Sequence, residues 1–479
     1  MNKSYKTLVV FLVFTTIIFA QQNETETYKK RVLETTEVDF LTSYYTQEGD
    51  NAAVTGGIGN EHLTDFTPTF VVSVPLNDDD VLTIDAGVSA YSSASSSNLN
   101  PFNFGGEEVD ISEMAPSNII GSPWVASSGA SKSDLWAGIS GDYSHSSPDR
   151  NTIWNADVSF ASEYDYFSIG FGGGITKLFN EKNTTINVST KIYLDSWKPE
   201  FPIELKWHTY VDGDLNAGVF RDVPIYNQNG IAIDKSGATG SVWSPDRYQG
   251  ISNKSRNSYS ISFSFSQILS KNAQASLFFD IVKQDGWLGN PMQRVYFSDI
   301  DNFYIGNASN IPNYRSSSNN DVFQLADDIE RLPNSRFKIP IGLSFNYYIN
   351  ETFTLRTYYR YYYDDWGINS HTANIEIPIK INSKFTLYPS YRYYNQTAAD
   401  YFEPFEEHVS TERYYTSDYD LSKFSANQYG FGISYADIFA KWHIKNFGLK
   451  NIDLKYNNYE RNSGLTANII SLGFKFAMD

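Results

Sequence analysis

Two short acidic motifs are the first places where this sequence could do chemistry. Asp212, Asp214 and Asn216 alternate as the oxygen ligands of a calcium loop do. However, Ala217 stands where such a loop needs its turn glycine, and Val223 stands where it needs the closing glutamate. We therefore expect a solvated polar loop and predict no metal site.

His62 is the one histidine in a dense acidic setting, with Glu61 beside it and Asp65 three residues further on. A histidine and acids at the rim of a membrane barrel could support general acid-base hydrolysis. No nucleophile motif with flanking glycines accompanies them, and the chain has no cysteine. We predict no catalytic residue and no cofactor, and an enzyme is the least favoured of three functions.

The elements that would position any site follow a two-residue hydrophobic period. From 336 to 347, Phe337, Ile339, Ile341 and their odd-numbered successors are apolar, while the even-numbered residues include Arg336 and Lys338. Successive side chains of a strand point to opposite faces, so this pattern is typical of amphipathic strands with one apolar and one polar face. Strands of about 10 residues, tilted by about 40°, span the roughly 25 Å apolar band of an outer membrane.

About sixteen such segments occur along the chain, which predicts an all-β fold, a transmembrane antiparallel β-barrel of about 14 to 18 strands. The segments are 36–46, 66–76, 81–91, 132–143, 152–162, 164–178, 184–196, 257–269, 274–286, 336–348, 353–365, 371–381, 385–397, 423–437, 451–461 and 465–477. Alternate connections are short, as at 77–80, 180–183 and 382–384, whereas the long ones at 47–65, 92–131, 197–256, 287–335 and 398–422 share one parity. This asymmetry predicts short periplasmic turns and long extracellular loops.

The N-terminus resembles a secretory signal. Lys3 and Lys6 precede an apolar run that ends at Ala20, and the run is too short for a spanning helix. We predict a signal peptide at 1–20, a short periplasmic segment at 21–35 and an outer-membrane barrel at 36–479. The net charge of −18 disfavours nucleic acid as a partner. Lipid and the insertion machinery of a Gram-negative outer membrane are the expected partners.

Several stretches of the mature chain resemble a family of outer-membrane proteins that is classed only as a domain of unknown function. The stretches are 39–45 (DFLTSYY), 48–50 (EGD), 54–61 (VTGGIGNE), 63–65 (LTD), 127–134 (SSGASKSD) and 197–199 (WKP). The resemblance covers nearly all of the mature chain. It implies an outer-membrane barrel and implies no activity.

If the apolar register faces lipid, charged residues line the lumen, with acids in the first third of the chain and bases in the last half. The acids are Glu37, Asp39, Asp85, Asp134, Asp142 and Asp157, and the bases are Arg336, Lys338, Arg356, Arg360, Lys380, Arg392, Lys455 and Lys475. Opposed walls of this kind orient dipolar solutes and keep a passage wet. The alternative is a set of structural salt bridges across a narrow or plugged barrel.

Tyrosines cluster near the ends of two predicted strands, where an interfacial girdle is expected. The more specific hypothesis is that tyrosine rings stack against a sugar, which only the inward-facing Tyr358, Tyr362 and Tyr394 could do. The predicted binding residues are Asp39, Asp85, Asp134, Arg356, Arg360, Glu376, Lys380, Arg392, Tyr358 and Tyr362. We predict a passive or weakly selective pore for small polar solutes. The alternative is a surface binding or assembly protein that uses its long loops.

Overall fold

The computed structural model describes residues 31–479, apart from 94–99, 103–121, 125–133, 320 and 438. The predicted signal peptide and most of the 127–134 stretch lie outside these residues. The boundaries of the signal peptide and of the periplasmic segment remain predictions. Among the described residues, no helix is both long and apolar enough to cross a bilayer.

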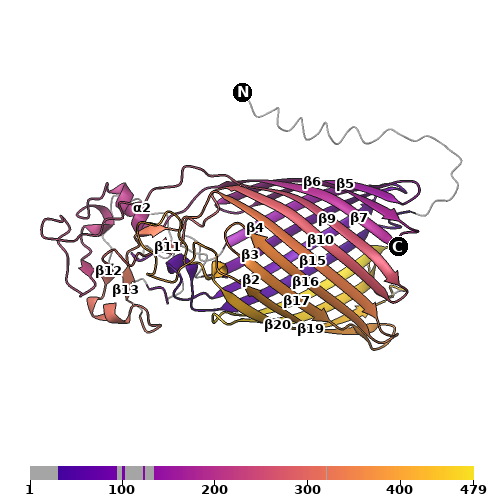
Figure 1. The fold of residues 1–479 in the computed structure, drawn as a ribbon. Helices are drawn as coiled ribbons and strands as arrows, with labels where there is room; N and C mark the ends of the chain where they lie inside the picture. The colour runs from indigo at the N-terminus through magenta and orange to yellow at the C-terminus, as the bar shows by residue number, and fades with distance from the viewer. Residues whose placement is uncertain (1–30, 94–99, 103–121, 125–133, 320, 438) are drawn as a thin grey trace, which may run out of the picture.

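Sixteen antiparallel strands form one closed barrel, because the last strand pairs with the first (Figure 1). The strands are β1 (Glu37–Glu48), β2 (Leu63–Pro75), β3 (Asp80–Ser93), β4 (Asp134–Ser146), β5 (Thr152–Ser162), β6 (Tyr166–Phe179), β7 (Thr184–Trp197), β9 (Arg256–Ser270), β10 (Ala273–Gly286), β15 (Ser335–Tyr348), β16 (Thr354–Asp364), β17 (Asn369–Glu376) continued by β18 (Ile379–Lys380), β19 (Phe385–Gln396), β20 (Phe424–Ala436), β22 (Phe447–Arg461) and β23 (Thr466–Met478). All sixteen predicted segments are confirmed. The predicted strand 371–381 is interrupted before Pro378, which has no N–H for the ladder.

Three of the short turns are built by asparagine side chains. The Oδ1 atoms of Asn77, Asn350 and Asn382 each accept hydrogen bonds from two backbone N–H groups further along the turn, at 2.8–3.0 Å. Such Asx-type bonds replace the ladder bonds that end at the turn. The chain therefore reverses its direction within a few residues at this end of the barrel.

The outer surface of the barrel is apolar and exposed. Phe70, Ile261, Leu343 and Phe431 are 50–56% exposed although they lie in the middle of strands. A closed barrel satisfies its backbone hydrogen bonds internally, so a band of this kind is stable in hydrocarbon and unfavourable in water. The protein is an outer-membrane β-barrel with long extracellular loops.

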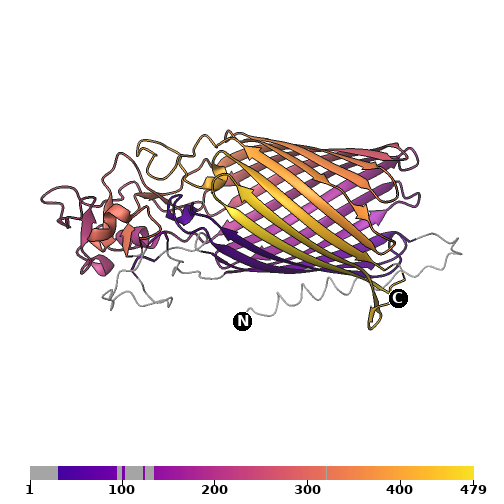
Figure 2. The ribbon, with the colours of Figure 1, turned by 90° about the horizontal axis from the view of Figure 1, so that it is seen from below.

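The long loops pack into a separate body, which we call the cap, beyond the outer end of the barrel (Figures 1 and 2). Its regular elements are η1 (Ala53–Thr55), α2 (Ile203–Tyr210), η2 (Gly218–Phe220), β8 (Ile225–Asn227), β11 (Arg294–Val295), β12 (Phe303–Gly306), η3 (Ala308–Asn313), β13 (Val322–Gln324), β14 (Asp328–Ile329) and η4 (Tyr419–Leu421). The largest buried hydrophobic cluster of the described residues lies here, with Phe102, Trp243, Ile305 and Phe405 from four different connections.

Candidate functional site

The register of the barrel places all ten predicted binding residues on strand positions that face the lumen. Asp39, for example, stands opposite Lys475, one position away from the half-buried Phe40–Phe474 pair. Asp85 and Asp134 lie on β3 and β4, and the other predicted residues lie on β16 to β19. Because side chains alternate along a strand, these positions face away from the lipid.

The two charged walls are present in the fold. Strands β1 to β5 carry acidic residues and contain no lysine or arginine. The predicted luminal bases lie on β15, β16, β18 and β19 and on β22 and β23, and Lys191 on β7 adds a base next to the acidic strands. In a closed ring of sixteen strands, β3 to β5 lie across the lumen from β16 to β19. The acids of β3 to β5 and the predicted bases of β16 to β19 therefore lie on opposite sides of the lumen.

Some of these charges are paired with neighbours on the wall. Lys475 lies 3.6 Å from Asp39, and Glu376 lies 3.0 Å from Arg356 and 3.6 Å from Lys455. These pairs fit the salt-bridge alternative. Each pair joins strands that lie near each other in the ring, and on the acidic wall Asp157 is paired in the same way with Lys191 of β7.

Other luminal charges have no ion-pair partner within the described part of the chain. Arg360, Lys380, Arg392 and Asp85 belong to this group, although the guanidinium of Arg360 lies 5.8 Å from the centre of the Tyr362 ring. Unpaired charges of this kind are tolerated where water screens them. The predicted binding residues therefore include both structural pairs and free charges.

The lumen is not packed like a protein core. Leu41 faces inward and is 46% exposed, and the side chain of Arg356 is 58% exposed. A cavity of about 680 Å³ opens between β1, β2, β19, β22 and β23, with Asp39, Tyr388 and Lys475 among its lining residues. A sixteen-stranded barrel is wide enough for an aqueous channel.

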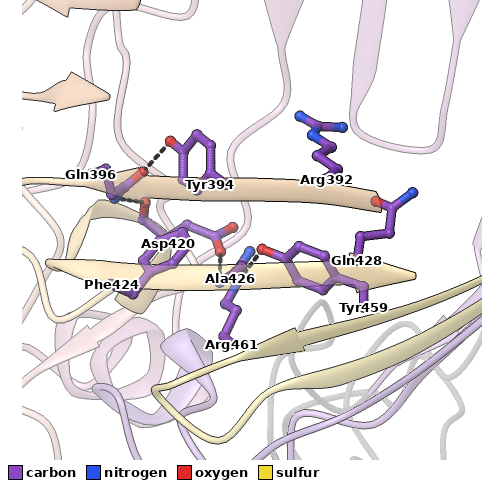
Figure 3. A pocket seen from close by; sticks show the side chains of 9 residues that line it. All are labelled: Arg392, Tyr394, Gln396, Asp420, Phe424, Ala426, Gln428, Tyr459 and Arg461. Atoms are coloured by element: carbon purple, nitrogen blue, oxygen red, sulfur yellow. Dashed lines mark hydrogen bonds and ion pairs between the residues drawn. The ribbon is translucent and has the colours of Figure 1, made fainter. Parts of the chain in front are cut away.

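A second pocket, of about 250 Å³, opens from the lumen at the outer ends of β19, β20 and β22 (Figure 3). Its lining residues are Arg392, Tyr394, Gln396, Asp420, Phe424, Ala426, Gln428, Tyr459 and Arg461. The alternation of inward-facing residues predicted Arg392 and Tyr394. It could also have indicated Tyr459 and Arg461, which are the last inward positions of β22, but it could not have indicated Asp420, which comes from a loop.

Hydrogen bonds hold the η4 loop against this pocket. Arg461 donates from Nη1 to Asp420 Oδ1 at 2.6 Å and from Nε to the hydroxyl of Tyr459 at 2.9 Å. Its guanidinium lies 4.5 Å from the centre of the Phe424 ring. Gln396 Nε2 donates to the backbone oxygen of Asp420 at 3.0 Å. The cap is thus fixed to the barrel wall at the outer mouth.

Arg392 is the free cation of the pocket. Its guanidinium projects away from Asp420 and makes no bond to the other side chains drawn in Figure 3. Tyr394 donates its hydroxyl to Gln396 Oε1 at 2.6 Å, so its oxygen can still accept a hydrogen bond. The arrangement offers a planar donor for a carboxylate and an acceptor for a hydroxyl or ammonium group.

The tyrosine hypothesis receives little support from the two predicted residues on β16. Tyr362 donates its hydroxyl to Asp364 Oδ2 at 2.7 Å, and Asp364 is also paired with Arg336. The hydroxyl of Tyr358 lies over Gly342, 3.0 Å from where a Cβ would be. The outward-facing Tyr359, Tyr363, Tyr391 and Tyr393 are 37–45% exposed and are placed as an interfacial girdle would be.

Buried carboxyl groups mark the joint between the cap and the barrel. Glu330 is 3% exposed and accepts hydrogen bonds from the Asn290 N–H at 2.5 Å and from Thr416 Oγ1. Burial, reinforced by the charge of Asp418, raises the pKa of Glu330 to about 8. Burial likewise raises the pKa of Glu61 to about 7. These groups are poised to change charge near neutral pH.

The other two motifs from the sequence are not assembled into sites. His62 is exposed, and its backbone N–H donates to Asn60 Oδ1, while Glu61 is turned inward and accepts from the Asn51 N–H at 3.3 Å. The carboxylate of Asp214 accepts a hydrogen bond from the backbone of Asn216 at 2.9 Å. Within the described ranges, no group of three or more histidine or acidic side chains could hold a metal ion.

Solved structures similar to this chain are at low identity. A bacterial polysaccharide outer membrane secretin is 9% identical, with 93% of this chain and 99% of that chain covered and a TM-score of 0.42. A FadL homologue from Pseudomonas aeruginosa is 9% identical, with coverage of 93% and 91% and a TM-score of 0.35. The toluene transporter TodX from Pseudomonas putida is 9% identical, with coverage of 93% and 90% and a TM-score of 0.35. At these values the likeness carries no argument about function.

No curated protein matches the sequence. One family does match, over residues 10–467, and its description is "Protein of unknown function (DUF3570)". The resemblance noted in the sequence is thereby confirmed, and the chain belongs to the DUF3570 family.

Proposed function

We propose that this barrel is a passive, weakly selective pore for small polar solutes, with a preference for zwitterionic molecules. The observation that carries the proposal is the transverse arrangement of charge, with Asp85 on one wall and the unpaired Arg360 and Arg392 on the other. Such a field orients a dipole across the passage and retains water around it.

The partial exposure of luminal side chains supports the same proposal. A plugged barrel would bury its inward-facing side chains, whereas Leu41 and Arg356 are well exposed. The pocket at Arg392 lies where a solute would leave the cap and enter the barrel. Its free guanidinium would hold a carboxylate for a short time without trapping it, because water screens the charge.

Swelling of proteoliposomes tests the proposal. Vesicles that contain the folded barrel should swell in glycine or serine at least as fast as in a neutral sugar of similar size, and protein-free vesicles should not swell. A variant with residues 203–250 replaced by a short glycine-serine turn should swell faster, because the cap then restricts entry less. A folded barrel that admits neither class of solute, with or without the cap, is not a pore.

A surface binding or assembly protein is the second candidate, and the packed cap favours it. Loops that only border a pore need no hydrophobic core, whereas the cap buries Phe220, Trp243 and Phe323 almost completely. A rigid exposed body of this kind is suited to holding a binding surface. This candidate is favoured if the barrel is impermeable and if variants changed only in the cap lose attachment to a cell-surface partner.

A further inference from the structure

A short hairpin between β20 and β22 exposes large apolar side chains at the short-turn end of the barrel. We call residues 437 and 439–446 the rim hairpin, which contains the two-residue strand β21 (His443–Ile444). Phe439 is 81% exposed and Trp442 is 76% exposed. These are the two most exposed large hydrophobic side chains in the described part of the chain, and Ile444 beside them is 63% exposed.

The rim hairpin is a built structure. The carboxylate of Asp437 is buried and accepts hydrogen bonds from the backbone N–H groups of Phe439 and Lys441, both at 3.3 Å. Leu449 donates its N–H to the backbone oxygen of Trp442 at 2.7 Å. Ala440 is buried against the barrel, where the absence of a side chain on Gly448 makes room for it. These bonds fix which side chains face outward.

The hairpin continues the lipid-facing surface of the barrel. Figure 2 shows it beside the C-terminus, projecting sideways from the wall at the short-turn end. The strands that flank it carry exposed apolar residues on their lipid face, such as Phe431 on β20 and Leu454 on β22. The level of the hairpin is therefore the periplasmic edge of the membrane, where aromatic side chains are enriched.

The charge of the hairpin is positive on its exposed side. Lys441 and Lys445 flank the apolar side chains, and the described residues contain no ion-pair partner for either. The two acids nearby are engaged elsewhere, because Asp437 holds the turn and Asp479 lies 3.1 Å from His443. An apolar tip between free lysines is complementary to an anionic lipid surface.

We propose that the rim hairpin is a lipid anchor, in which Phe439, Trp442 and Ile444 insert into the periplasmic leaflet while Lys441 and Lys445 bind the headgroups of anionic phospholipids. This site is independent of the lumen, so the proposal stands whether or not the barrel conducts solutes. It would fix the depth and tilt of the barrel at its periplasmic edge.

Fluorescence quenching by brominated lipid tests the anchor in the full-length barrel, reconstituted in phosphatidylcholine vesicles. The signal of Trp442 is obtained as the difference between the wild type and Trp442→Phe. It should be strongly quenched by brominated acyl chains and protected from aqueous iodide. The difference signal of Trp207→Phe, which reports on the cap, should show no quenching by brominated lipid.

Headgroup binding is tested by placing the bromine on a minor fraction of phosphatidylglycerol or, at the same fraction, of phosphatidylcholine. Brominated phosphatidylglycerol should quench Trp442 more, and Lys441→Gln with Lys445→Gln should remove that preference, which we expect to be on the order of fivefold per lysine. Heat-modifiable migration in gels verifies that each variant is folded. A Trp442 that iodide quenches and brominated lipid does not would overturn the anchor, and equal quenching by both lipids would overturn the headgroup site.

Discussion

Arg294 and Glu204 form a bidentate ion pair in the interior of the cap, although 90 residues separate them. Arg294 Nε lies 2.7 Å from Glu204 Oε1, Nη2 lies 2.9 Å from Oε2, and neither side chain is exposed. The same guanidinium donates to the backbone oxygen of Val54 at 3.1 Å. One side chain thus joins three extracellular connections, and it can do so because its planar fork presents donors in several directions.

Removing one partner of this pair should unfold the cap and leave the barrel intact. Glu204→Gln leaves a buried guanidinium without a counter-charge, which we expect to cost about 3–5 kcal/mol of cap stability. Limited proteolysis and hydrogen exchange should show opening of the loops, with heat-modifiable migration of the barrel preserved. Lys206→Gln, on the same helix but in an exposed pair with Glu200, is the control and should change stability by less than about 1 kcal/mol. If the loops of both variants are equally protected from proteolysis and hydrogen exchange, the Arg294–Glu204 pair does not hold the cap together.

The cap should become less stable as pH rises through neutrality. The pKa of Glu330 is about 8 in the folded protein and has an ordinary value of 4.5. Between these values the folded state holds a proton that the unfolded state releases, so this contribution to stability is complete below about pH 4.5 and is lost up to about pH 8. Proteolysis of the cap should be slower at pH 5 than at pH 8.

Glu330→Gln should flatten this pH dependence, because the amide stays neutral and Thr416 can accept its N–H. We expect the variant to resist protease at pH 8 better than the wild type. Glu61, whose pKa is raised to about 7, would leave a smaller residual slope. A pH profile that is unchanged by the substitution would show that Glu330 does not carry the effect.

Two adjacent residues on β9 test which side chains of a strand point to the lipid and which point to the lumen. Ile261 is 56% exposed on the lipid side, while Ser262 stands opposite Asp280 on the luminal side. Ile261→Arg should destabilise the barrel by about 2–4 kcal/mol in a lipid bilayer. Ser262→Arg should be tolerated, because its guanidinium reaches water and an acid. Denaturant unfolding in vesicles measures the stability of both variants. If Ser262→Arg is the more destabilising of the two, Ser262 faces the lipid and the assigned facing is wrong.

Luminal packing is tested at Gly432, which lies beneath the ring of Tyr388. A Cβ at this position would stand 2.0 Å from the ring, and Tyr388 donates to Asp453 Oδ1 at 2.8 Å. Gly432→Ala should displace the ring and cost about 1–3 kcal/mol. Gly141→Ala, on the lipid side with no atom within 4 Å of its Cβ position, should be neutral. Matching losses in the two variants would exclude the Tyr388 contact as the cause.

The barrel was predictable from the sequence because its physical signal is local. Residues 337–347 alternate between two environments, and the same alternation assigned Asp85 and Arg392 to the lumen. The short turns were predictable for a similar reason, since Asn350 and Asn382 carry their own backbone bonds. The break before Pro378 was missed, although proline there is a recognisable signal, and so was the short strand β21 between β20 and β22.

The cap was not predictable in the same way. Its core brings together residues such as Val54, Trp243 and Phe405, which follow no period and come from different loops. Its central ion pair joins residues that nothing in the sequence relates to each other. For the same reason the sequence indicated Arg392 but not Asp420, whose position depends on how a loop folds back on the barrel.

The most direct test of the charged walls is the reversal potential of the reconstituted barrel in a planar bilayer under a KCl gradient. Arg356→Gln, Arg360→Gln and Arg392→Gln together should shift selectivity toward potassium, whereas Asp85→Asn with Asp142→Asn should shift it toward chloride. Opposite shifts are expected because the two sets line opposite sides of one water-filled passage. A conducting barrel whose reversal potential is the same in all three proteins would contradict the account.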